Sequence, residues 1–135
     1  MGLELQYLGW AAILTLLLRV PWMVDKVRVR GLGKVTGYPA DSEPLSGWGR
    51  RAWIAHEDAV QNLVVFGMLV MVLHLGGESN AWTRGAAALY FWARLVHAVV
   101  YLFAIPRIKT VAFLAAFGAQ LLLAWQFVLL VWRSV

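Results

Sequence analysis

The sequence predicts an all-α integral membrane protein, a bundle of four transmembrane helices in a single domain over residues 1–135. Hydrophobic residues make up 61% of the chain and charged residues only 14%, whereas soluble domains carry about 25% charged residues. The apolar residues also gather in four runs, each close to the ~20 residues that a helix needs to cross ~30 Å of hydrocarbon. These runs cover residues 3–24, 52–75, 81–105 and 111–132.

The first run, residues 3–24, is predicted to be a transmembrane helix and not a cleaved signal sequence. It lacks a short basic start and a small-residue cleavage site, and Glu4 precedes its apolar stretch. Pro21 is expected to kink or end this helix. The middle of the run, residues 12–16, carries no carboxylate, which argues against a small proton-coupled drug exporter.

The polar segment over residues 25–51 is rich in glycine, proline and turn-forming residues, so we expect an irregular loop, too short to bury a core. Basic residues flank this loop and the turn before the last run, whereas the opposite side carries only Arg84 and Arg133. By the positive-inside rule the first and third loops are cytoplasmic and both termini lie outside, in what we expect to be a bacterial inner membrane. The net charge of +5 is explained by this topology and by contact with membrane lipids, without nucleic acid as a partner.

The second run, residues 52–75, opens with an unusually polar third that contains His56, Glu57, Asp58, Gln61 and Asn62. A short turn over residues 76–80 follows and makes the second and third runs antiparallel neighbours.

The third run, residues 81–105, places an arginine at bilayer depth, where a charge costs roughly 2.5–3.5 kcal/mol and usually marks function. Tyr90, Arg94, His97 and Tyr101 fall on one helical face. At about 1.5 Å per residue, this stripe and the polar third of the second run lie in the same half of the membrane. We therefore expect Arg94 to pair with Asp58 or Glu57 beside a polar cleft. The other interpretation is a simple clamp between two helices, which would use fewer polar groups than are present.

The fourth run, residues 111–132, has no charge, and its Trp125 and Trp132 are typical of an outer aromatic belt. Cysteine is absent and the three histidines lie on separate helical faces. The sequence therefore predicts neither disulfides nor a metal site.

Three segments carry a resemblance to a known family: Ser46–Ala52 with Ala55–Leu63, Leu89–His97, and Tyr101-Leu102 before Ile105-Pro106. In order and spacing they resemble the second and third helices of the MAPEG family, the membrane-associated proteins of eicosanoid and glutathione metabolism, and especially its bacterial branch. The resemblance implies a homotrimer of four-helix protomers that binds glutathione between subunits near the cytoplasmic side.

The resemblance also implies an activity, that of a glutathione transferase or peroxidase acting on small hydrophobic electrophiles. Tyr101 with Lys109 or Arg107 would stabilise the thiolate of glutathione and would be the catalytic residues. The residues expected to hold the rest of glutathione are Arg94, His97, Tyr90, Asp58, Gln61, His56, Arg51 and Arg28.

The second-helix pattern of the family, Arg-Ala-His-x-Asn-x-x-Glu, is altered in this chain. Ile54 replaces the arginine, Asp58 the asparagine and Gln61 the glutamate. Loss of the arginine removes a bidentate carboxylate partner, while Asp58 supplies a carboxylate one turn away from the missing glutamate. This change motivates an alternative function, a non-catalytic trimer that binds a lipid or another small ligand, or that scaffolds partners.

Overall fold

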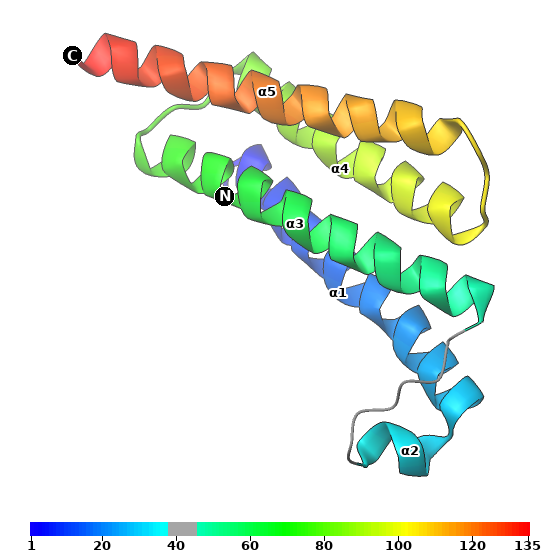
Figure 1. Ribbon diagram of the computed structural model, residues 1–135. Helices are drawn as coiled ribbons and strands as arrows, with labels where there is room; N and C mark the ends of the chain where they lie inside the picture. Colours follow the sequence, from blue (N-terminus) through cyan, green and yellow to red (C-terminus); the bar gives the residue numbers. More distant parts are fainter. Residues whose placement is uncertain (38–45) are drawn as a thin grey trace.

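The computed structural model describes residues 1–37 and 46–135, and within them the chain forms four long helices and one short one (Figure 1). These are α1 (Leu3–Arg30), α2 (Leu32–Thr36), α3 (Gly47–Leu75), α4 (Ala81–Leu102) and α5 (Ile108–Ser134). The four long helices are each long and apolar enough to cross a membrane. The predicted all-α bundle of four transmembrane helices is confirmed.

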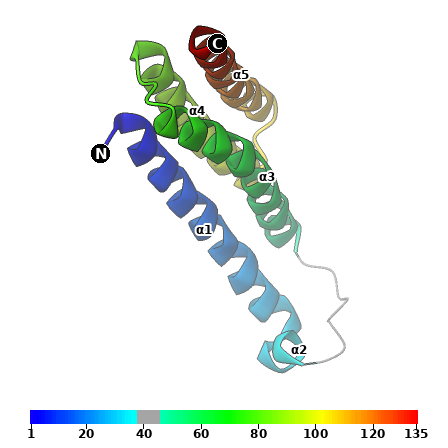
Figure 2. The ribbon, with the colours of Figure 1, turned by 90° about the vertical axis from the view of Figure 1, so that its left-hand side faces the viewer.

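The long helices alternate in direction, so each end of the bundle has its own set of connections (Figure 1). Both termini and the α3–α4 turn lie at one end, called here the terminal end. Helix α2 and the α4–α5 turn lie at the other, called here the loop end. Helix α1 packs on α3 and α4, and α5 packs on α4 and α3 (Figure 2).

Small residues let the helices approach closely in the core. Ala86 and Ala87 of α4 and Ala116 and Ala119 of α5 are almost completely buried, as is usual where membrane helices meet, because small side chains let backbones come close together. The largest buried pair is Phe66 of α3 stacked on Tyr90 of α4, and it lies within the same cluster. Their ring centroids are 3.8 Å apart.

Helix α1 is longer than its apolar run, because it continues through Pro21 to Arg30. Pro21 therefore does not end the helix, and residues 25–30 are helical where a loop was expected. The cause is a tertiary contact. The fully buried Asp25 carboxylate accepts hydrogen bonds from the Ser46 hydroxyl (2.7 Å) and the Ser46 backbone N–H (3.3 Å).

Ser46 also begins α3, since its hydroxyl accepts a hydrogen bond from the Gly49 N–H at 3.1 Å. The absence of a side chain at Gly49 is what makes room for Asp25. A Cβ atom at this position would overlap the Asp25 carboxylate and would lie 2.5 Å from its Cγ. Residues 25–30, 32–36 and 47–51 of the expected loop are thus helical, as the end of α1, as α2 and as the start of α3. Residues 38–45 of the expected loop lie outside the described residues.

Candidate functional site

The site is centred on an ion pair between α3 and α4. The Arg94 Nη2 atom donates to the Asp58 Oδ2 atom at 3.0 Å, and the His97 Nε2 atom lies 3.7 Å from the same oxygen. The Arg94 side chain is only 4% exposed and the Asp58 side chain 29% exposed. The expected pairing of Arg94 with a carboxylate of the preceding span is therefore present, and its guanidinium lies inside the bundle and not against lipid.

Two amide side chains connect this ion pair to α5. The Asn62 Nδ2 atom donates to the Asp58 backbone oxygen at 2.8 Å and to its Oδ1 atom at 3.2 Å. The Gln120 Nε2 atom of α5 donates to the Asn62 Oδ1 atom at 3.1 Å. Neither amide is among the residues predicted from the sequence to bind glutathione, although Asn62 belongs to the polar third of the second run. The sequence signal that could have identified Gln120 is that a glutamine in an otherwise apolar membrane helix needs a hydrogen-bond partner from a neighbouring helix.

The ion pair leaves several polar atoms unused. Among the described residues, Arg94 Nε, Arg94 Nη1 and His97 Nδ1 are buried and have no hydrogen-bond partner. A buried donor without a partner costs about 1–3 kcal/mol. These atoms are therefore unsatisfied in the described part of the protomer, and those of Arg94 lie behind Asp58 and His97, which line the groove while Arg94 does not.

A groove of about 320 Å³ lies beside the ion pair. Its polar lining residues are Asp58, His97, Tyr101, Lys109 and Thr110, and Ile54 and Phe113 complete the lining. The three residues Ile54, Thr110 and Phe113 are exposed, so the groove opens on the surface of the protomer.

A second hollow of about 180 Å³ adjoins the groove, since Tyr101 and Lys109 line both. The Tyr101 ring is stacked on the His97 ring with centroids 5.7 Å apart. The Lys109 Nζ atom lies 5.3 Å from the centroid of the same tyrosine ring, which is within the range of a cation–π contact. From the loop end toward the ion pair, the Lys109 ammonium, the Tyr101 phenol and the His97 imidazole thus follow one another.

The model of the MAPEG family matches residues 7–129. The chain belongs to the MAPEG family. It is therefore a membrane protein of the kind associated in general with glutathione or eicosanoid metabolism. No curated protein sequence gives a significant match. The ion pair, the groove and both unexpected amides lie within the matched residues of this MAPEG protein.

The α4–α5 turn of this MAPEG protein determines which of its cations reaches the groove. Ala104 (φ 55°) and Arg107 (φ 70°) both have positive φ angles, a strained conformation that costs a non-glycine residue on the order of 1–3 kcal/mol. The turn carries Lys109 over Tyr101, while Arg107 is exposed and lines neither hollow. Of the two cations named from the sequence, the structure brings Lys109 to the site.

Three further residues named from the sequence make contacts of their own near the loop end. Arg51 lines the smaller hollow, and its Nε atom donates to the Leu102 carbonyl oxygen at 3.2 Å. His56 contacts α1 through its Nδ1 atom, 3.1 Å from the Thr15 carbonyl oxygen. Arg28 is exposed and pairs with Asp25 at 3.1 Å.

The remaining two named residues lie away from the groove. Tyr90 packs in the apolar core against Phe66, and Gln61 is exposed and lines neither hollow. Within residues 1–37 and 46–135 there is no group of three His, Asp or Glu side chains that could hold a metal ion.

Proposed function

We propose that this MAPEG protein binds glutathione in the groove beside Arg94 and uses it as a transferase or peroxidase on hydrophobic electrophiles. The observation that carries the proposal is the buried Arg94, which keeps two guanidinium nitrogen atoms without partners next to a groove lined by Lys109 and Tyr101. Glutathione carries two carboxylates, one ammonium group and one thiol. Arg94 and Lys109 complement the negative charges, and Asp58 is the acceptor for the ammonium group.

The reaction begins with ionisation of the bound thiol. A free thiol has a pKa of about 8.5, so only a small fraction is thiolate at neutral pH. A nearby cation lowers the pKa of a thiol, and in this site Lys109 supplies the cation and Tyr101 a phenolic donor. In the transferase reaction the thiolate sulfur forms a bond to an electrophilic carbon, whose leaving group departs with its electron pair.

The peroxidase reaction uses the same thiolate. Its sulfur attacks the distal oxygen of a lipid hydroperoxide, the O–O bond breaks, and the alkoxide takes up a proton to leave as an alcohol. A second glutathione then reduces the sulfenic acid, releasing water and glutathione disulfide. In this scheme the protein supplies only positioning, a cation and a hydrogen-bond donor.

The open side of the groove favours a homotrimer, as the family resemblance implies. Ile54, Thr110 and Phe113 face outward at the groove mouth, so a neighbouring protomer would cover a bound peptide while an apolar substrate arrives from the lipid. In this proposal the basic loop end is cytoplasmic, both termini are outside, and the host membrane is a bacterial inner membrane.

The test is the rate of conjugation of glutathione to a hydrophobic aryl halide by purified protein in detergent. Tyr101→Phe keeps the ring stack and removes the hydroxyl, and we expect it to lower kcat by about 10–100-fold. Lys109→Met is expected to lower the rate by a similar factor. Arg107→Met tests whether the other cation named from the sequence contributes to the rate. Arg50→Met, an exposed cation at the same end, is the matched control. Rates within twofold of wild type in both Tyr101→Phe and Lys109→Met would exclude this mechanism.

One observation favours a second function, a non-catalytic trimer that binds another ligand or scaffolds partners. Ile54 lies in the groove wall where the family pattern has an arginine, and the charge of Arg94 is already paired with Asp58. Thermal stabilisation by glutathione without turnover of any of several electrophiles would support binding alone. No stabilisation by glutathione, together with stabilisation by a phospholipid, would support a lipid-binding role.

A further inference from the structure

We propose that the terminal end contains a second ligand site, centred on the Glu4 carboxylate and specific for an ammonium group that carries at least one N–H donor. Glu4 is only 9% exposed. Its Oε2 atom accepts hydrogen bonds from the Ser79 hydroxyl (2.7 Å) and the Thr83 hydroxyl (2.9 Å). Its Oε1 atom is buried and has no hydrogen-bond partner among the described residues. Half of a buried carboxylate is therefore left without a donor.

This carboxylate lines a cavity of about 250 Å³. The wall combines polar residues with the apolar side chains of Leu5, Val70, Leu73 and Leu123. Glu4 is one of the lining residues, and Oε1 is the carboxylate oxygen that Ser79 and Thr83 do not already engage. The cavity is lined from the start of α1, the end of α3 and the α3–α4 turn, whereas the groove includes Lys109 and Thr110 at the start of α5. The α3–α4 and α4–α5 turns lie at opposite ends of the bundle (Figure 1), so this site is independent of the proposed glutathione chemistry.

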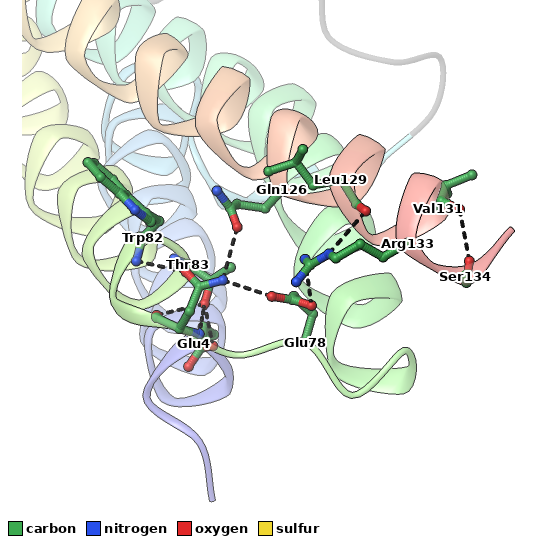
Figure 3. A network of polar contacts seen from close by, with 10 residues as sticks. Glu4, Glu78, Trp82, Thr83, Gln126, Leu129, Val131, Arg133 and Ser134 are labelled. Atoms are coloured by element: carbon green, nitrogen blue, oxygen red, sulfur yellow. Dashed lines mark hydrogen bonds and ion pairs between the residues drawn. The ribbon is translucent and has the colours of Figure 1, made fainter.

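Other charged side chains at this end already have partners (Figure 3). Glu78 pairs with Arg133 at 3.0 Å and accepts from the Asn80 amide at 2.8 Å. The Arg84 Nη1 atom donates to the Ser79 hydroxyl oxygen at 3.5 Å. Glu4, in contrast, makes no direct ion pair with a described residue: hydroxyl groups meet its Oε2 atom, and Arg84 acts on it only at longer range. A cationic guest would therefore bring the direct ion-pair partner that this carboxylate lacks.

The site needs a ligand that brings both a positive charge and an N–H donor to Oε1. An ammonium group with at least one N–H brings both, whereas an anion or a pure acceptor brings neither. The cavity is below the roughly 300 Å³ at which drug-sized ligand sites begin, so the part that enters is small. The exposed Trp82 beside Asn80 is typical of a membrane interface. The ammonium group can come from a soluble amine or from the ethanolamine headgroup of a phospholipid.

The test uses the purified full chain in detergent and a methylation series. Phosphatidylethanolamine, its N-methyl and N,N-dimethyl forms and phosphatidylcholine lose one N–H with each methyl group while the charge is constant. We expect binding, followed by native mass spectrometry, to persist to the dimethyl form and to weaken about tenfold or more at the choline headgroup. Soluble ethanolamine and choline, read by melting temperature, form the second arm. A response to ethanolamine alone assigns the ligand as a soluble amine, and a response to the lipid alone assigns a headgroup.

Glu4→Gln is the matching variant, because its amide oxygen still accepts from Ser79 and Thr83 while the charge is lost. We expect it to lose the preference for ethanolamine over choline, whereas Glu57→Gln, an exposed carboxylate on α3, retains it. Equal binding of the choline and ethanolamine forms by wild-type protein would overturn the proposal, and this result does not depend on whether Glu4→Gln folds. An unchanged preference in a folded Glu4→Gln variant would overturn it as well.

Discussion

Replacing Asp58 by asparagine would test the energetic role of the buried ion pair. The substitution keeps the shape of the side chain and one oxygen acceptor, but it leaves the Arg94 guanidinium without a counter-ion. Removal of one partner from a fully buried pair costs about 3–5 kcal/mol. Asp58 is 29% exposed and Arg94 only 4% exposed, and asparagine can still accept one hydrogen bond. We therefore expect a smaller loss, about 2–3 kcal/mol.

The assay is thermal unfolding of purified protein in one detergent at one protein concentration. For a chain of this size the loss corresponds to a fall in Tm of roughly 6–12 °C. Glu57→Gln removes the neighbouring exposed carboxylate and is expected to change the stability by no more than about 0.5 kcal/mol. The double variant Asp58→Leu/Arg94→Met, which removes both charges, should recover much of the loss. If Asp58→Asn melts at the same temperature as Glu57→Gln, the pair does not stabilise the bundle.

Two further predictions concern packing and the amide connection. Gly49→Ala should lower the free energy of unfolding by about 1–3 kcal/mol, because the new methyl group overlaps the buried Asp25 carboxylate. Gly85→Ala, where a Cβ meets nothing within 4 Å, should instead gain up to about 1 kcal/mol, and equal effects of the two substitutions in thermal melts would refute the clash. Asn62→Leu should cost about 1–3 kcal/mol, because Gln120 and Asp58 then lose their amide partner. Adding Gln120→Leu should restore part of that stability in the same melts, and an additive further loss would contradict the proposed chain of hydrogen bonds.

The transmembrane architecture was predictable because the apolar runs have the length of a membrane crossing and the turns between the last three runs are short. The ends of the helices were less predictable. Helix α1 reaches Arg30 because Asp25 meets Ser46, which is 21 positions further along the chain. A local pattern contains no information about such a contact.

The Arg94–Asp58 pair was predictable for two reasons: a charge at this depth needs a partner, and helix rise places the two residues at similar depth. The helical stripe alone did not give the surroundings of each residue. Tyr90 shares the face of Arg94, but the side chain opposite it is Phe66 and not a polar residue. The rotation of α5 that brings Gln120 to Asn62, and the turn with positive φ angles that selects Lys109 over Arg107, depend on the packed structure.

The most direct measurement for the proposed glutathione site is a glutathione titration of wild-type protein and of Arg94→Lys, read by melting temperature in detergent. Lysine keeps the positive charge beside Asp58 but lacks the two guanidinium nitrogen atoms that have no partner in the structure. We predict that glutathione raises the melting temperature of wild-type protein, and that the titration midpoint of Arg94→Lys lies about tenfold or more higher. No glutathione-dependent shift in wild-type protein, or the same midpoint in both proteins, would contradict the account.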